Sequence, residues 1–311
     1  MSFLGIPLIP FIMTLVGAAT PLLLAALGEL VVEKSGVLNL GVEGMMLTGA
    51  VVGFAVTYTT GSPWLGIGAA AIAGGMVSMI FAFLTLSLSA NQVATGLALT
   101  IFGTGFSALF GQPFTGKPLE PFRSIFPPEL AGHDVFRVIF GFSPLVYFSL
   151  IMVVAVWWFL HRTRAGLILR AVGENDLSAH SIGYSVIGVR YAAVAFGGAM
   201  AGIAGSCFPL ILTPQWVERL TAGRGWIALA LVVFAAWRPF RLLAGAYLFG
   251  FIATMEVYAK AAGGSFRILP SEVWASLPYL ATILVLVLIS LRRQGSTSAP
   301  ACLGKPFVPS T

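Results

Sequence analysis

Long apolar runs, separated by short polar segments, dominate the pattern of this chain. A helix that spans a bilayer needs about 20 mostly apolar residues, with a range of about 17 to 25. Runs of this length lie at about 8–32, 44–60, 64–88, 92–111, 144–161, 190–212, 242–262 and 275–291. A further run at about 225–237 is shorter, so it either crosses together with its flanks or is a half-helix that stops inside the bundle. The pattern predicts an all-α, polytopic bundle of about nine transmembrane segments, within a range of about eight to ten.

The composition excludes a soluble protein. Of the 311 residues, 58% are hydrophobic and 9% are charged, and the mean hydropathy is +0.95. Soluble domains are about 45–50% apolar and about 25% charged, so this chain has too few polar side chains to cover a globule in water. The runs are also too long and unbroken for an outer-membrane barrel, whose strands are alternating segments of about 10 residues.

Three polar segments complete the predicted domain organisation. A transmembrane domain covers 1–293, and the long loop at 112–143 is rich in prolines, which deny it a long helix. A shorter and more basic loop covers 162–189. The tail at 294–311 is rich in Ser, Thr and Pro, and we expect it to be disordered and cytoplasmic.

Basic residues near helix ends indicate the orientation, because cytoplasmic loops carry an excess of Lys and Arg. With the 162–189 loop inside, 10 of the 17 basic residues are inside and 7 are outside. The inside set is Lys34, Arg162, Arg164, Arg170, Arg190, Arg238, Arg241, Arg292, Arg293 and Lys305. The outside set is Lys117, Arg123, Arg137, Arg219, Arg224, Lys260 and Arg267. With nine crossings, this assignment places the 112–143 loop and the N-terminus outside.

Charge and cysteine content exclude several other kinds of partner and site. The net charge is +6, but the basic residues stand singly or in pairs, which favours anchoring at lipid headgroups over nucleic-acid binding. Cys207 and Cys302 form neither a disulfide framework nor a metal-binding spacing. No Lys or Arg precedes Lys34, so we expect the apolar N-terminal stretch to be a retained helix and not a signal peptide. Since no P-loop, HExxH or other catalytic motif is found, we expect no enzymatic activity, and any ATPase must be another chain.

The stretch from Glu29 to Glu43 is unusually polar for its position between apolar runs. It contains three carboxylates, Lys34 and Asn39, with Gly36 and Gly41 on either side of the asparagine. Two interpretations remain open. The stretch is either an ordinary cytoplasmic turn or a re-entrant break, since irregular backbone is tolerated where it lines a cavity.

A polar stripe begins the fourth predicted helix. Asn91 and Thr95 are four residues apart, as are Thr100 and Thr104, so each pair shares a helix face. Such a stripe makes either interhelical hydrogen bonds or contacts with a solute. Since polar side chains facing lipid have no partner, we expect it to face the bundle interior. The candidate substrate path consists of Asn39, Glu43, Asn91, Gln92, Thr95 and Thr100.

Small residues and one acidic residue within the apolar runs also allow two interpretations. Gly198 and Gly202 form a small-xxx-small face, which indicates close helix packing or a glycine-lined path. Glu256 lies within the 242–262 run, nearer its outer end. A carboxylate in hydrocarbon is a functional candidate by default. Glu256 is therefore either an ordinary residue near a helix end or the coupling site of an ion- or proton-coupled secondary transporter.

Four blocks of sequence carry a resemblance to a known family. They are EKSGVLNLGVEGMM at 33–46, ANQVATGLALT at 90–100, RAVGEN at 170–175 with Ile182-Gly183 and Ala201-Gly202 after it, and GRGWIALA at 223–230. In this order, they resemble the ABC-importer permeases of the branched-chain amino acid/simple-sugar class. The first block is similar to the nucleoside-type subfamily.

The resemblance implies a permease subunit of the plasma (inner) membrane that carries nucleosides or simple sugars. A second permease, often a related but different chain, would complete the pore. Two ATP-binding cassette subunits would dock inside and bind the ATP, so that the permease itself holds no cofactor. An extracytoplasmic substrate-binding protein would dock outside.

The cytoplasmic loop at 162–189 is the expected contact with the ATPase. By its position, the resemblance implies a short helix between Gly166 and Gly183 that sits in a cleft of that subunit. The candidate coupling residues are Arg170, Gly173, Glu174, Asn175 and Gly183. The loop departs from the general importer pattern, because Asn175-Asp176 follow Glu174 where two alanines are usual. The remaining interpretation is a solvated basic loop.

Overall fold

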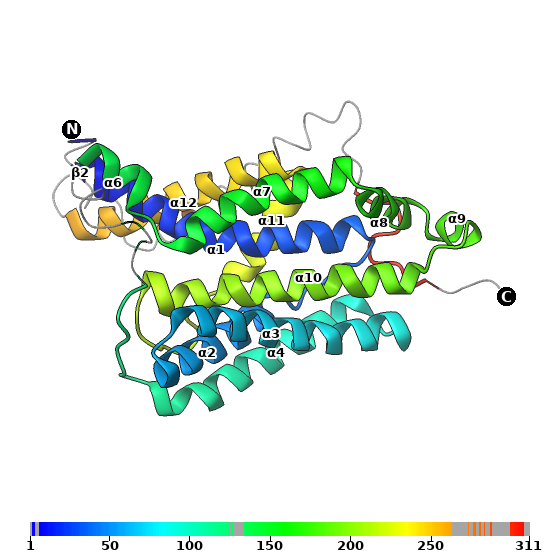
Figure 1. The fold of residues 1–311 in the computed structure, drawn as a ribbon, viewed down its shortest axis with the longest axis horizontal. Helices are drawn as coiled ribbons and strands as arrows, with labels where there is room; N and C mark the ends of the chain where they lie inside the picture. The colour runs from blue at the N-terminus through cyan, green and yellow to red at the C-terminus, as the bar shows by residue number, and fades with distance from the viewer. Residues whose placement is uncertain are drawn as a thin grey trace.

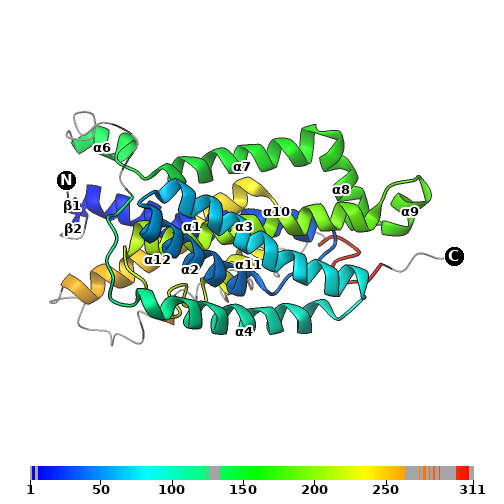
Figure 2. The ribbon, with the colours of Figure 1, turned by 60° about the horizontal axis from the view of Figure 1, so that its bottom comes forward.

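A computed structural model of the chain describes residues 2–3, 6–122, 124, 126, 134–262 and 299–307, together with isolated positions between 273 and 287. The fold is an all-α bundle of long helices that share one axis (Figure 1). The long helices are α1 (Leu8–Lys34), α2 (Val42–Thr60), α3 (Pro63–Ala82), α4 (Gln92–Gly111), α7 (Pro144–Arg162), α10 (Val186–Cys207) and α12 (Pro239–Ala262). In both ribbon views, α1 and α10 lie between α7 on one side and α4 on the other (Figure 2).

Shorter elements connect the long helices. They are α6 (Asp134–Phe140), α8 (Arg164–Glu174), α9 (Asp176–Ser181), α11 (Arg224–Phe234) and the 3-10 turn η2 (Gln112–Phe114). Two π-helical segments, η1 (Phe83–Ser87) and η3 (Phe208–Leu212), extend α3 and α10. Before α1, the strands β1 (Ser2–Phe3) and β2 (Ile6–Pro7) form a short antiparallel pair.

Seven helices within the described residues are long and apolar enough to cross a membrane. They correspond to seven of the eight full-length runs expected from the sequence. The eighth, at 275–291, lies outside the described residues apart from isolated positions, so the expected number of about nine segments stays a prediction. The short run at 225–237 contains α11, whose 11 residues rise about 16 Å. This length is half of a bilayer crossing and favours the half-helix interpretation.

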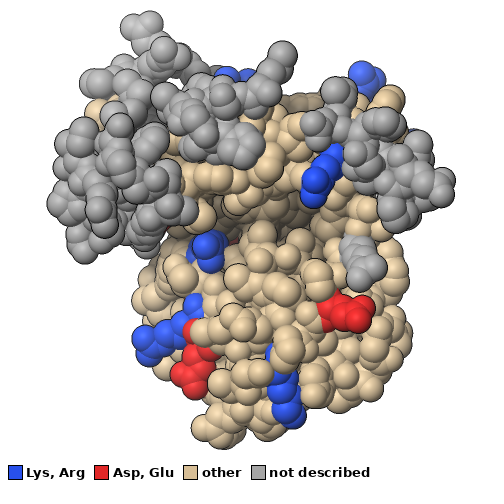
Figure 3. All heavy atoms as spheres, turned by 90° about the vertical axis from the view of Figure 1, so that its left-hand side faces the viewer, with Lys and Arg blue, Asp and Glu red and all other residues tan. Residues whose placement is uncertain are grey.

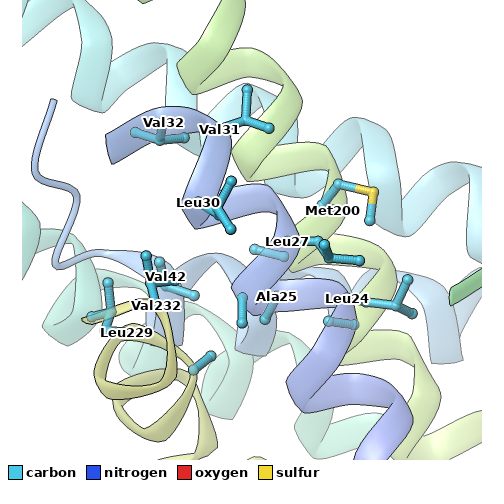
Figure 4. Close-up of a cluster of buried hydrophobic side chains, with 14 of the residues drawn as sticks. Leu24, Ala25, Leu27, Leu30, Val31, Val32, Val42, Met200, Leu229 and Val232 are labelled. Atoms are coloured by element: carbon cyan, nitrogen blue, oxygen red, sulfur yellow. The ribbon is translucent and has the colours of Figure 1, made fainter. Parts of the chain in front are cut away.

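The core forms around the second half of α1, which is buried on every side between Ala19 and Glu33. Its sequence there is apolar all round apart from a few polar positions, as expected of a helix enclosed by others. Leu24 and Leu27 lie towards Met200 of α10, while Leu229 and Val232 of α11 lie on another side (Figure 4).

Glycines bring α3, α10 and α2 into close contact. A methyl group on Gly202 of α10 would overlap the Ala70 carbonyl of α3, and one on Gly49 of α2 would overlap Gly202 itself. Gly198 lies in the same way against Ser78. Small residues permit this approach, which provides van der Waals contact where lipid offers no hydrophobic driving force. The small-residue face of α10 therefore serves helix packing.

The two ends of the bundle differ. We refer to the end with α8, α9 and residues 299–307 as the inner end, following the orientation expected from the basic residues (Figure 1). The opposite, outer end carries α6 and the start of α1. Viewed from that side, the described residues show a few charged side chains on a mostly uncharged surface (Figure 3).

The tail differs from the sequence expectation at residues 299–307. These residues are packed against the inner end, where Cys302 N donates to Gly173 O (2.9 Å) and Gly304 N donates to Gly36 O (3.1 Å). Phe307 is buried among Val172, Ala179 and Val186. The composition predicted disorder because it reflects the side chains. This segment is held instead by hydrogen bonds of its backbone and by the side chain of Phe307.

Candidate translocation path and coupling region

The residues between α1 and α2 turn back into the bundle. The turn begins at Gly36, whose φ of +90° suits a glycine. Asn39 N then donates a hydrogen bond to Glu29 Oε1 (3.2 Å). Since Glu29 lies five residues before the end of α1, the chain has moved back by about 7.5 Å along that helix. We call residues 35–41 the re-entrant segment, and its course favours the re-entrant interpretation of the sequence.

One face of α4 holds the re-entrant segment in place. Gln92 Oε1 accepts a hydrogen bond from Leu38 N (2.8 Å), and Thr100 Oγ1 donates one to Leu40 O (3.1 Å). Between them, a side chain at Gly96 would come within 2.8 Å of Leu40 N. These three residues are four apart and therefore share a face. Gln92 and Thr100 thus bond backbone groups of the non-helical re-entrant segment.

The structure brings some of the predicted path residues together and not others. Asn39 is fully buried, and its Oδ1 accepts from Gly41 N (3.0 Å). Gln92 and Thr100 bond the backbone of the residues on either side of it, Leu38 and Leu40. Asn91, in contrast, is exposed at the start of α4, where its Oδ1 accepts from Ala94 N (3.0 Å) and caps the helix. Thr95 is only partly buried. Contact of these residues with a solute stays a prediction.

Glu43 fixes the start of the half-helix α11. Its carboxylate accepts hydrogen bonds from Thr221 Oγ1 (2.5 Å), Gly223 N (2.9 Å) and Gly225 N (2.6 Å). The last two donors are backbone amides at the start of α11, and amides at the start of a helix have no acceptor within that helix. A negative side chain at this position also complements the positive end of the helix dipole. Glu43 is buried and acts as a cap supplied by α2.

The other end of α11 is held at the inner end of α1. Trp237 Nε1 donates a hydrogen bond to Glu33 Oε2 (2.5 Å), and Lys34 Nζ lies 5.9 Å from the centre of the Trp237 ring. The sequence showed the carboxylates of the Glu29 to Glu43 stretch but not their partners. Thr221 and Trp237 were missed because they are more than 170 residues further along the chain.

Two short helices form the coupling region at the inner end. Thr163 Oγ1 accepts from Gly166 N (3.0 Å) and caps α8, while Asn175 Oδ1 accepts from Ser178 N (2.9 Å) and caps α9. The expected short helix of this loop is therefore a pair of helices. The turn after α9 has Gly183 at a φ of +92°.

The candidate coupling residues differ in exposure. Glu174, Asn175 and Gly183 are exposed, and Arg170 is partly buried. Gly173 is buried, and a methyl group there would overlap the carbonyl of Lys34. The three exposed residues are therefore free to meet a partner protein, whereas Gly173 joins α8 to the end of α1.

Glu256 lies near the outer end of α12 and is partly buried. Its neighbour Tyr258 is 5.6 Å, ring to ring, from Phe11 at the start of α1. The side chain of Lys260, four residues further along the same helix, lies outside the described residues. Across the part of the chain that the structure describes, no three His, Cys, Asp or Glu side chains gather as metal ligands would.

Comparison with known proteins gives one consistent family. Residues 11–289 match the family described as the permease component of the branched-chain amino acid transport system. TsgC13 of Haloferax volcanii, assigned as a glucose ABC transporter permease protein, is 41% identical over 303 residues, which cover 90% of this chain and 91% of that one. The guanosine ABC transporter permease protein NupQ of Bacillus subtilis is 32% identical over 309 residues, 95% of each chain.

A solved structure and two weaker relatives agree with this family. A solved inward-facing structure of a metal-chelate type ABC transporter has a TM-score of 0.53 at 12% identity, over 90% of this chain and 85% of that one, and so shares the fold. The same two organisms each have a second similar protein, the glucose permease protein TsgB13 (29% over 210 residues) and the guanosine permease protein NupP (26% over 201 residues), each matching 60% of this chain.

The family match extends from the first long helix to beyond α12 and confirms the resemblance found in the sequence. Members of this family are transport proteins and not enzymes, and the alternative of a secondary transporter coupled through Glu256 is not favoured. The chain therefore belongs to the permease family of the branched-chain amino acid transport system, and it is a multi-pass permease subunit of an ABC transporter in the plasma membrane.

Proposed function

We propose that this chain forms half of the translocation path of a binding-protein-dependent importer whose cargo is a nucleoside or a simple sugar. The observation that carries the proposal is the α8–α9 pair at the inner end, where Glu174, Asn175 and Gly183 are exposed. Within the described residues this pair is the only helical segment that lies beyond the long helices at that end (Figure 1). A soluble motor must transmit force through such a surface.

The partners follow from this arrangement. Two ATP-binding cassette subunits bind the ATP and dock on α8 and α9, and the permease itself carries no cofactor. A second, related but different permease completes the pore, since Haloferax volcanii and Bacillus subtilis each have, besides a similar full-length permease, another that matches this chain more weakly. An extracytoplasmic substrate-binding protein delivers the cargo to the outer end.

The cargo proposal rests on two supports. Two of the similar full-length proteins, TsgC13 and NupQ, are named for glucose and guanosine. Both are neutral, hydroxyl-rich solutes. Gln92 and Thr100 are uncharged polar residues beside the re-entrant segment, and Gln92 Nε2 is buried without a hydrogen-bond partner, so it is left to bond such a solute.

Uptake by the reconstituted complex tests the function. The permease pair, both ATPase subunits and the binding protein are placed in vesicles, and radiolabelled nucleosides and simple sugars are offered with and without ATP on the ATPase side. We expect uptake of one of the two solute classes, and only with ATP. Uptake of neither class, or uptake by this chain alone without the ATPase, would contradict the proposal.

A charge reversal in the same vesicles tests the coupling surface. Glu174→Arg changes an exposed side chain of α8, so the fold should be preserved. We expect uptake per ATP hydrolysed to fall by roughly fivefold, within the range of known coupling mutations. Glu218→Arg, which reverses an exposed charge away from the inner end, is the matched control. Equal coupling in both variants would remove Glu174 from the interface.

A further inference from the structure

Residues 299–307, which we call the C-terminal strap, lie across the junction of the coupling region and α1. The strap contacts both sides of this junction through its backbone. Cys302 N donates to Gly173 O of α8, and Gly304 N donates to Gly36 O of the re-entrant segment. The strap lies outside the residues that match the family.

The side chain of Arg190 bonds the strap, the re-entrant segment and α9. Its side chain is fully buried at the start of α10. Nε donates to Ser35 O (3.2 Å), one terminal nitrogen forms an ion pair with Asp176 of α9 (3.1 Å), and the other lies 3.4 Å from Lys305 O of the strap. One guanidinium thus joins the re-entrant segment, the coupling helices and the strap. A buried charge with this many partners holds their relative positions, because any displacement leaves a donor or the charge unsatisfied.

Phe307 anchors the far end of the strap. It is 9% exposed and packs against Val172 of α8, Ala179 of α9 and Val186 of α10. Its ring lies 5.4 Å from that of His180. Because Phe307 contacts α8, α9 and α10 together, it fills the gap at which these three helices meet.

We propose that the C-terminal strap and Arg190 are positioning elements of coupling, which lock α8 and α9 to the re-entrant segment so that a movement of the coupling helices reaches Asn39 and Gln92. This inference rests on the proposed function, since it assumes that α8 and α9 receive the force. The strap itself does not touch the cargo. Without the strap, Arg190 and the contact of Gly173 with Lys34 still join the coupling helices to the re-entrant segment and α1, but less of the movement reaches Asn39 and Gln92.

The experiment compares two truncations of side chains in the strap within the complete complex. Phe307→Ala removes the buried anchor. Lys305→Ala removes an exposed side chain two residues earlier and leaves the carbonyl that Arg190 contacts. For Phe307→Ala we expect uptake per ATP hydrolysed to fall roughly fivefold, with assembly and ATP hydrolysis retained. We expect no change for Lys305→Ala, and substantial recovery for Phe307→Leu, which restores an apolar anchor.

The native thiol of Cys302 reports whether the strap is docked. The chain has two cysteines, and Cys207 is buried within α10, whereas Cys302 is partly exposed with its Sγ 3.6 Å from Glu174 O. We expect a water-soluble maleimide to label Cys302 about tenfold faster in Phe307→Ala than in the wild type, because loss of a buried Phe weakens the docking. Lys305→Ala should label at the wild-type rate.

The outcomes separate this inference from the proposed function. If the wild-type complex shows no ATP-dependent uptake, the proposed function fails. If the wild type transports and Phe307→Ala labels faster but transports as well per ATP, the strap does not position the coupling helices and the inference is wrong. Equal labelling of all variants also overturns it, because Phe307 then does not hold the strap.

Discussion

At the scale of single residues, the polar side chains inside the bundle hold irregular backbone. Glu29 accepts from the amide of Asn39, and Glu43 accepts from two amides and a hydroxyl near the start of α11. A buried polar group without a partner costs several kcal/mol in hydrocarbon. These amides have no partner within a helix, and the carboxylates have no water around them. Each therefore stabilises the other by the hydrogen bond between them.

Replacing Glu43 tests this role. Glu43→Gln keeps the size of the side chain but turns one acceptor into a donor, so at least one of the three donors of the 221–225 segment loses its partner. We expect the free energy of unfolding to fall by about 2 to 3 kcal/mol, the cost of an unsatisfied buried donor to a charged group. Thermal unfolding of the purified protein in detergent measures this as a melting temperature lower by several degrees.

Glu218→Gln is the control for Glu43. It makes the same substitution at an exposed position of the loop that leads into α11. Surface changes of this kind alter stability by less than about 0.5 kcal/mol. Equal melting temperatures for the two variants would show that the Glu43 contacts contribute little.

At the scale of elements, the contact between α3 and α10 depends on glycine. A methyl group on Gly74 would lie 2.8 Å from Gly202 Cα, whereas one on Gly75 would meet nothing within 4 Å. We expect Gly74→Ala to destabilise the protein by about 2 kcal/mol through overpacking. Gly75→Ala should be neutral or stabilising by up to about 1 kcal/mol, since Ala is the better helix former.

Unfolding in a denaturing detergent compares the two variants directly. The substitution is chemically identical and shifts by one residue, so helix propensity is the same in both. Only the direction of the side chain differs. If Gly75→Ala proved as destabilising as Gly74→Ala, close packing would not explain why α3 carries both glycines.

The sequence predicted the long helices well because each is a continuous apolar run, and this signal is local. It did not decide the course of residues 33–43 or of α11. Their backbone is stabilised by Gln92, Thr100 and Glu43, which lie on other elements and up to about 180 residues away. Hydrogen bonds across such distances leave no periodicity in the sequence, and the docking of Phe307 is hidden for the same reason.

At the scale of the whole molecule, the source of energy sets the role of Glu256. An importer driven by ATP needs no carboxylate of α12 to change its charge in each cycle. We expect Glu256→Gln to lower stability slightly and to leave uptake dependent on ATP and unaffected when the proton gradient is collapsed. Uptake in vesicles supplied with ATP and an uncoupler measures this.

The opposite result would point to another kind of transporter. If Glu256→Gln abolished uptake, and the uncoupler abolished it in the wild type at constant ATP, the transport cycle would depend on a gradient. The position of Glu256 near the outer end of α12 suits a residue at the outer opening better than one at the centre of the bilayer, where coupling sites of secondary transporters are found.

The cap that α2 provides for α11 also sets an order of events during synthesis. Glu43 leaves the ribosome 178 residues before Thr221 and 182 before Gly225. At about 5 to 20 residues per second, the delay is on the order of ten to forty seconds. Throughout that time α1 and α2 are in the membrane while the carboxylate still lacks all three of its final donors. The first third of the chain thus completes its structure only after synthesis has passed the start of the last third. A nascent chain stopped before residue 221 contains a charged group that only water, a proton or the insertion machinery can satisfy.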